Sequence, residues 1–304
     1  MRGPVTVIGG ANTDILGFVE RPLVPRDSNP GHIRTSPGGV GRNIAENLAR
    51  LGIATRLVTS LGDGSPGDEI EKSCTEVGIE LLPVSTPGCT APRYMAIMDE
   101  AGDLALGIND MRALEAITPD AIAMHATTID ESAIIVLDTN LPAETLEYVA
   151  ERWGDRPILL DTVSVAKAPR ARGLLGRLHT LKTNELEAAA LAGTAAGAVD
   201  AAVDALLIAG AERIVITGGV AGALFASGVS RVRFVPPPAE VVNATGAGDA
   251  YMAGLVYAVL EGFDTTHTAA FASAVASVAL GSERTVSETL TEQSVLERME
   301  EMLS

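Results

Sequence analysis

Residues 243–249 read NATGAGD, and they open an apolar run, AYMAGLVYAVL, over residues 250–260. Gly246 and Gly248 let the backbone approach a ligand closely, and N–H groups at the start of a helix attract an anion. Asp249 would then lie in the first helical turn, where a carboxylate can take a hydroxyl proton during phosphoryl transfer. The simpler alternative is that Thr245 or Asp249 only caps the helix, which explains one polar residue but not two glycines.

Short apolar runs alternate with helical patterns along the rest of the chain. VTVIGG (5–10) and RIVITGG (213–219) are typical of buried strands, and NIAENLARLG (43–52) is typical of a helix. This alternation predicts βαβ units and a mostly parallel sheet covered on both faces, in a single domain spanning residues 1–304. Two segments interrupt the pattern, 13–36 and 91–108, and we expect them to form a small β flap beside the main sheet.

Composition excludes several classes of partner. The formal charge of −17 repels phosphate backbones and anionic membranes, so we expect no nucleic acid polymer and no membrane as partner. An anionic ligand must therefore bind through local backbone N–H groups or a metal. Two cysteines, Cys74 and Cys89, make no disulfide framework, and no apolar run is long enough to span a bilayer. We expect a soluble cytoplasmic protein.

Two N-terminal stretches are candidates for binding a hydroxylated ligand. Asn12 and Asp14 follow the first strand and face one side of it, at the edge of the sheet where α/β proteins bind ligands; Asp14 suits the two hydroxyls of a ribose. Gly38 and Gly39 precede a helix that starts near Asn43, whose amide can donate and accept. The alternatives are a solvated loop for the first stretch and a capped helix for the second.

Two further stretches suggest a nucleotide with its metal. Asn184 and Glu187 lie three residues apart at a strand–helix junction, either as oxygen ligands of Mg²⁺ through water or as a capping box. Thr217, Gly219 and Gly222 follow a strand, either as a backbone surface for a nucleotide or as a tight turn.

Together these elements resemble the ribokinase family, also called PfkB carbohydrate kinases, over essentially the whole chain. GGVGRNIAENLARLG (38–52) is similar to its first signature and NATGAGDAYMAG (243–254) to its second. The resemblance implies an α/β, ribokinase-like three-layer sandwich with a mostly parallel central sheet and a small β lid, formed by roughly residues 13–36 and 91–108. It also implies ATP-dependent phosphorylation of a sugar hydroxyl, with Mg²⁺.

The resemblance assigns roles residue by residue. Asp249 is the implied catalytic base, and Asp14, Gly39 and Asn43 hold the sugar. The implied anion hole for the γ-phosphate consists of Gly246, Ala247 and Gly248. The implied nucleotide and metal side consists of Lys182, Asn184, Glu187, Thr217, Gly219 and Gly222. Many members have Asp where this chain has Asn243, beside Thr245; Asn keeps an oxygen ligand for a monovalent cation such as K⁺ but loses the charge.

Within the family, DSNPGHIRTSPGGVGRNIAENLA (27–49), LGINDM (106–111) and DTVSVAK (161–167) are most similar to the branch that phosphorylates the 5′-hydroxyl of pseudouridine. Another ribofuranosyl substrate, ribose or a different nucleoside, is the alternative. Ser28, Asn29 and Asn109 are the candidates for reading the base, and Lys167 is a further substrate contact unless it is a plain surface lysine. The resemblance and the exposed flap also suggest a homodimer.

Overall fold

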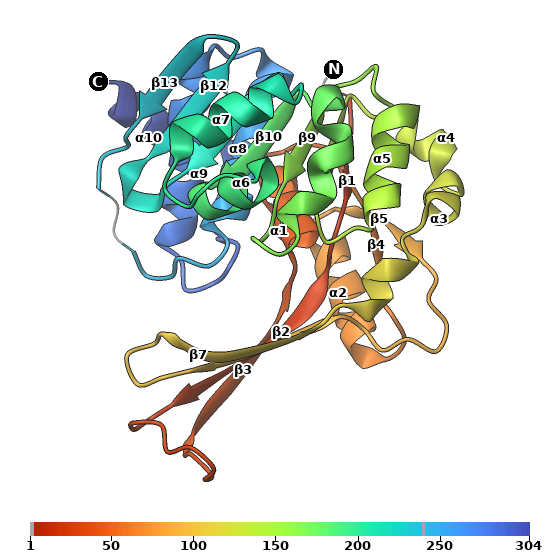
Figure 1. Ribbon diagram of the computed structural model, residues 1–304. Coiled ribbons are helices and arrows are strands. Elements are labelled where there is room, and N and C mark those ends of the chain that lie inside the picture. Colours follow the sequence, from red (N-terminus) through yellow and green to blue (C-terminus); the bar gives the residue numbers. More distant parts are fainter. Residues whose placement is uncertain (1–2, 239–240) are drawn as a thin grey trace.

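The computed structural model describes residues 3–238 and 241–304, and in them nine strands form a central sheet in the order β13-β12-β11-β10-β9-β8-β1-β4-β5 (Figure 1). Neighbouring strands pair in parallel except at β11–β12 and β12–β13, which are antiparallel. The strands are β1 (Val5–Ile8), β4 (Thr55–Ser60), β5 (Glu80–Val84), β8 (Ile134–Asp138), β9 (Ile158–Asp161), β10 (Thr180–Asn184), β11 (Ile214–Thr217), β12 (Ala223–Ser227) and β13 (Ser230–Phe234).

Helices cover both faces of this sheet. One face packs on α1 (Val40–Arg50), α2 (Ser65–Glu76), α8 (Ala247–Glu261), α9 (Thr265–Leu280) and α10 (Glu292–Leu303). The other face packs on α3 (Pro119–Ala123), α4 (Ala126–Ile129), α5 (Ala143–Arg152), α6 (Glu185–Ala192), α7 (Val199–Ile208) and the 3₁₀ segments η1 (Arg112–Ala116) and η2 (Ala168–Arg177). A third 3₁₀ segment is η3 (Gly219–Ala221).

The strands divide their side chains between these two layers. In β8, Ile134 and Val136 join the core under α1 and α8, while Ile135 and Leu137 join the core under α5. Because a strand sends alternate side chains to opposite faces, a strand buried on both faces reads as a continuous apolar run. The predicted three-layer architecture with a mostly parallel sheet is confirmed.

A second, smaller sheet projects from this body, as Figure 1 shows for β2, β3 and β7. In the described residues it has four strands in the order β3-β2-β6-β7, namely β2 (Asn12–Val19), β3 (Gly31–Gly38), β6 (Arg93–Met98) and β7 (Leu104–Asp110). The turn between β6 and β7 is closed by Asp99, whose Oδ1 accepts from the N–H groups of Ala101 and Asp103 at 2.9 Å each. The predicted small β unit is thus present.

The two faces of the small sheet differ in chemistry. Register aligns Asp14 with Tyr94, and Tyr94 with Asn109, in one polar row. The next row, on the opposite face, aligns Ile15, Met95 and Ile108. Met95 and Ile108 are exposed, so this second face lacks the helical cover that the central sheet has.

In the described residues, the helices are all too short or too polar to cross a bilayer.

Candidate active site

The site lies at the carboxyl edge of the central sheet, where open α/β sheets bind ligands. Asp138 and Asp161 end β8 and β9 there, and α1 and α8 begin there. The Asn43 Nδ2 in α1 donates a 2.8 Å hydrogen bond to Oδ2 of Asp249 in α8. The two glycine-rich signatures, whose residues 43 and 249 are 206 positions apart, therefore meet at one point.

The start of α8 depends on glycine. Gly246 has φ 84°, and a Cβ on it would lie 2.2 Å from the carbonyl oxygen of Thr285, so no other residue fits without a shift. A Cβ on Gly248 would lie 3.0 Å from Lys182 Nζ. The ammonium group of Lys182 therefore lies beside the first turn of α8. Its positive charge and the partial positive charge of the backbone N–H groups of that turn, including that of Ala247, would attract the same anion.

Asp249 is poised to exchange a proton near neutral pH. Burial raises its pKa to about 7, and the nearby carboxylates of Asp161 and Asp138 push in the same direction. The hydrogen bond from Asn43 and the charge of Lys182 oppose this rise only in part. A base is most effective when its pKa lies near the working pH, so this environment suits a carboxylate that takes up a proton.

Lys182 is part of this cluster. Its Nζ lies 2.8 Å from Oδ2 of Asp161, and both side chains are buried. Burial alone would lower the pKa of Lys182, but the carboxylates of Asp161, Asp249 and Glu187 together outweigh it and leave the pKa above its ordinary value. Lys182 therefore carries a fixed positive charge between Asp161 and the start of α8.

Asn12 and Asp14 lie where β2 leaves the body. The Asn12 Nδ2 donates to Asp14 Oδ1 at 2.6 Å. Burial raises the pKa of Asp14, while Asn12 and the charge of Arg42 oppose that rise. Gly38 faces this carboxylate, since a Cβ there would lie 2.1 Å from Asp14 Oδ2. Gly39 has φ 99° and packs directly on the backbone of residues 10–11.

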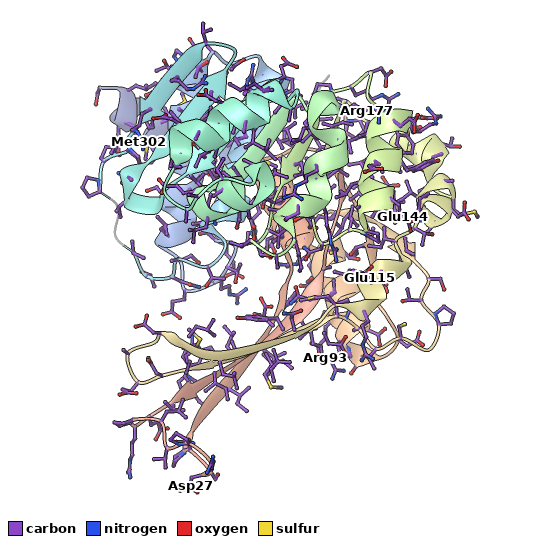
Figure 2. The ribbon with its side chains drawn as sticks, viewed as in Figure 1. Asp27, Arg93, Glu115, Glu144, Arg177 and Met302 are labelled. Atoms are coloured by element: carbon purple, nitrogen blue, oxygen red, sulfur yellow. The ribbon has the colours of Figure 1, made fainter. Side chains whose placement is uncertain are left out.

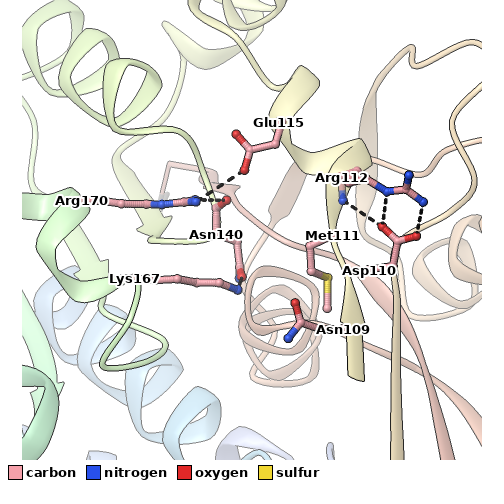
Figure 3. A pocket seen from close by; sticks show the side chains of 8 residues that line it. All are labelled: Asn109, Asp110, Met111, Arg112, Glu115, Asn140, Lys167 and Arg170. Atoms are coloured by element: carbon pink, nitrogen blue, oxygen red, sulfur yellow. Dashed lines mark hydrogen bonds and ion pairs between the residues drawn. The ribbon is translucent and has the colours of Figure 1, made fainter. Parts of the chain in front are cut away.

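A cavity of about 510 Å³ opens between the base of the small sheet and the loops after β8 and β9 (Figure 3). Two predicted substrate residues, Asn109 and Lys167, line it together with Asn140. Lys167 Nζ donates to Asn140 Oδ1 at 2.6 Å, and burial lowers the pKa of Lys167. Lys167 is thus a half-buried residue that faces a cavity rather than a plain surface lysine. The remaining lining residues are Asp110, Met111, Arg112, Glu115 and Arg170.

Ser28 and Asn29 are not brought to this cavity. They follow Asp27, which Figure 2 places at the far tip of the small sheet. The Asn29 side chain holds that tip together, since its Oδ1 accepts from Val24 N at 2.8 Å and its Nδ2 donates to the carbonyls of Val24 and Asp27 at 3.0 Å each. In this structure Asn29 therefore organises the loop.

The residues expected on the nucleotide side lie at the ends of β10 and β11. Asn184 and Glu187 form a complete capping box on α6, and Glu187 Oε2 also accepts from Thr162 at 2.6 Å. Thr217 donates to the carbonyl of Thr183 at 3.2 Å. Gly219 begins the η3 turn that follows β11 and Gly222 ends it, and both have positive φ.

Asn243 and Thr245 form the loop that leads into α8. Asn243 Oδ1 accepts from Thr245 N at 2.9 Å, and Asn243 Nδ2 donates to the carbonyl of Glu283 at 3.2 Å. The amide of Asn243 therefore ties this loop to the segment that follows α9. Its oxygen is already used within the loop.

Sequence reasoning missed Asp138, Asp161 and Asn140. Asp138 is fully buried and accepts from the N–H groups of Gly10 and Asn140 at 2.8 Å each. A usable signal existed, because IIVLD (134–138) and ILLD (158–161) each end an apolar strand with an acid. An acidic residue at the carboxyl end of a buried parallel strand indicates this edge of the sheet.

Comparison with known proteins agrees with this geometry. Residues 4–292 match the pfkB family carbohydrate kinase model. The chain belongs to the pfkB family of carbohydrate kinases. A pseudouridine kinase from Escherichia coli (strain K12) is 35% identical over 302 residues. The alignment covers 97% of this chain and 96% of the E. coli protein. This pfkB kinase is therefore a phosphotransferase that acts on an alcohol group, within a family of ATP-dependent sugar and nucleoside kinases.

Solved structures share the fold of this pfkB kinase. A carbohydrate kinase from Agrobacterium tumefaciens superposes with a TM-score of 0.87 at 30% identity, covering 98% of this chain and 97% of that one. An Arabidopsis thaliana ribokinase, solved with ribose and ATP, superposes with a TM-score of 0.86 at 23% identity, covering 98% and 99% of the two chains. This second likeness concerns the fold alone.

Proposed function

We propose that this pfkB kinase transfers the γ-phosphoryl group of ATP to the 5′-hydroxyl of pseudouridine. The observation that carries the reaction is the partly buried Asp249 carboxylate at the start of α8, held by Asn43 at 2.8 Å. The substrate choice is supported by the 35% identical pseudouridine kinase, which covers the chain almost end to end.

In the proposed reaction, Asp249 takes the proton of the 5′-hydroxyl as its oxygen bonds to the γ-phosphorus. The bond from that phosphorus to the bridging oxygen breaks, and ADP leaves with the electron pair. Backbone N–H groups of Gly246, Ala247 and Gly248 and the ammonium of Lys182 stabilise the charge on the moving group. In such transfers the protein contributes mainly by positioning groups and stabilising charge.

The nucleoside would lie between two walls. Asp14, with Asn12 and the closely packed Gly38 and Gly39, accepts hydrogen bonds from the ribose hydroxyls. The base enters the cavity lined by Asn109 and Lys167, where an ammonium donor and an amide can pair with the uracil carbonyl and N–H groups. Closing the small sheet over this space as a lid would exclude water, which otherwise competes as acceptor.

ATP would lie along the ends of β10 and β11, against Thr217, Gly219 and Gly222. Among the described residues, no group of three or more His, Cys, Asp or Glu side chains is placed to enclose a metal ion. Asn184 and Glu187 are the residues that would hold Mg²⁺ through water, since this ion usually keeps several waters when a protein binds it beside phosphates. When bound there, Mg²⁺ would neutralise phosphate charge. Asn243 and Thr245 are the candidates for a monovalent cation such as K⁺.

A homodimer joined through the small sheets is part of this proposal. The outer face of that sheet exposes Ile33, Met95, Leu106 and Ile108, an apolar surface that a second copy would cover. Light scattering on the purified protein should give twice the mass of the chain. The Ile108→Asp variant should give the mass of a single chain.

A substrate panel tests the choice of nucleoside. ADP formation is followed with pseudouridine, uridine, adenosine and ribose at matched concentrations, and the phosphorylated position is assigned by ³¹P–¹H correlation. We expect the highest kcat/KM for pseudouridine, with phosphate on the 5′ oxygen. A higher kcat/KM for ribose or adenosine would reject pseudouridine as the substrate and leave the kinase chemistry in place.

A further inference from the structure

The helix that carries Asn43 also carries a row of buried charges that no part of the proposed reaction uses. Arg42 is only 6% exposed and Glu46 only 5%. Arg42 Nη2 lies 2.5 Å from Glu46 Oε2, and Arg50 Nη2 lies 2.7 Å from Glu46 Oε1. The row Arg50–Glu46–Arg42 therefore runs along α1 toward the site.

The row ends on the amide of Asn43. Arg42 Nη1 donates to Asn43 Oδ1 at 3.3 Å, and the same amide donates through Nδ2 to Asp249. An amide turned by 180° would point its oxygen at the Asp249 carboxylate and its N–H groups at a guanidinium, and both contacts would be repulsive. The charge of Arg42 thus favours one of the two amide orientations.

Stability alone does not account for Arg42. A buried ion pair is often no more stabilising than apolar residues of the same volume, because both charges lose their hydration. Among the described residues, the buried Nε of Arg42 also has no hydrogen-bond partner, which is a further cost. A residue held at this cost beside a catalytic group is more readily explained by what it positions.

We propose that Arg42 is a positioning residue that fixes the Asn43 amide with its oxygen toward the guanidinium and its N–H toward Asp249. This inference rests on the proposed role of Asp249 as the base. Because the fixed amide can only donate to Asp249, it favours the carboxylate over the protonated acid. Without Arg42 the amide is free to turn and accept from a protonated Asp249, so the base would hold its proton to higher pH.

Other charged groups face the same two residues and stay unchanged in the test. Asp249 faces Asp161 of β9, Lys182 of β10 and Asp138 of β8. Arg42 faces Glu46 on its own helix, Cys74 of α2 and Asp14 of β2. Since Asp14 is proposed to bind substrate, its response to the loss of Arg42 should appear in KM, whereas that of Asp249 should appear in kcat.

The test compares Arg42→Met with Arg50→Met by the pH profile of kcat, measured with saturating ATP and whichever substrate the wild type uses fastest. Arg50 is the matched control, because it pairs with the same Glu46 but does not contact Asn43. The acid limb is the part of the profile in which kcat falls as Asp249 becomes protonated. In Arg42→Met we expect this limb to move up by about one pH unit, which is a tenfold loss of kcat at pH values below the limb. In Arg50→Met the limb should stay in place. Glu46→Gln should move the limb in the same direction by less.

An unmoved limb in Arg42→Met, or an equal shift in Arg50→Met, would overturn the inference. If Arg42→Met does not fold, as judged by circular dichroism, Glu46→Gln decides on the same criterion. A wild type that prefers ribose to pseudouridine would reject the proposed substrate without affecting this comparison. A flat wild-type profile down to pH 5 would instead reject Asp249 as the base.

Discussion

The central sheet and the small sheet both contain apolar side chains, yet they differ in what covers them. Leu137 in β8 is fully buried between two layers of helices, whereas Leu106 in β7 is 56% exposed. The central sheet therefore holds most of the buried apolar area, while the small sheet presents one polar face and one bare apolar face. The comparison separates a region that stabilises the fold from a region that is free to adapt to a ligand.

This division also separates the two carboxylates of the site. Asp249 is fixed by α8, Asn43 and the charges at the ends of β9 and β10, so its geometry is set before any substrate arrives. Asp14 belongs to β2, the strand that links the body to the small sheet, and within the described residues its side-chain hydrogen bond comes from its neighbour Asn12. We expect the first to control the chemical step and the second to control binding.

The largest effect expected is from Asp249→Asn. Removing a general base typically costs 10²-fold to 10⁴-fold, so kcat should fall by about that much with little change in KM. Coupled measurement of ADP release on the variant and the wild type checks this. Unchanged kcat in a folded Asp249→Asn protein would contradict the assignment of the base.

The same substitution should stabilise the protein at alkaline pH. Because the folded pKa of Asp249 is raised from 3.8 to about 7, the folded state binds the proton more tightly than the unfolded chain does. The stability from this group is complete below pH 3.8 and is lost as pH rises through about 7. At pH 8 the melting temperature of Asp249→Asn should therefore exceed that of the wild type, and at pH 4 the difference should be much smaller.

Asp14→Asn should produce the next largest effect, and on the other side of the comparison. A lost hydrogen bond to a charged group costs about 1.5–3 kcal/mol, and two ribose hydroxyls are proposed to bind this carboxylate, so kcat/KM should fall by about 10²-fold. Most of the loss should appear in KM, measured by initial rates over a wide range of nucleoside concentration. A loss confined to kcat would place Asp14 in the chemical step instead.

The next prediction compares two leucines directly. Both variants are made in the Ile108→Asp background, which keeps the proposed dimer apart. Leu137→Ala leaves a cavity in a closed core and should lower the free energy of unfolding by about 3 kcal/mol, whereas Leu106→Ala should change it by less than about 0.5 kcal/mol. Urea unfolding of both variants, followed by circular dichroism, gives the two values. Similar losses would mean that the small sheet is packed within the single chain.

The fold was predictable because its signal is local. The apolar runs of β1, β8 and β9 show the burial on both faces that a parallel sheet requires, and the helical pattern of α1 shows the apolar side that packs on one of those faces. The importance of Gly39 and Gly246 was also predictable, since few other residues tolerate a positive φ or a close backbone approach.

Parts of the site were not predictable because they depend on distant contacts. The pairing of Lys182 with Asp161, and of Lys167 with Asn140, joins residues from different strands and loops that no spacing rule connects. Ser28 and Asn29 were chosen by resemblance, but their loop projects beyond the body on an eight-residue strand. For Asn184 and Glu187 the sequence was ambiguous, because the same three-residue spacing is compatible with a capping box and with a metal site.

The smallest effect expected is from Lys167→Met, which tests whether the cavity at the junction of the two sheets reads the base. Loss of one charged hydrogen bond to the uracil ring should raise KM for pseudouridine about tenfold and leave KM for ribose unchanged, because ribose has no group in the cavity. Lys72→Met is the control, since Lys72 lies on α2 with a side chain 77% exposed and pairs with Glu76 at 3.8 Å. Because burial lowers the pKa of Lys167, its ammonium group should lose its proton at a lower pH than that of an exposed lysine. The wild-type KM for pseudouridine should rise as this proton is lost. An equal rise in KM for ribose would show that Lys167 supports the site as a whole and that the base is read elsewhere.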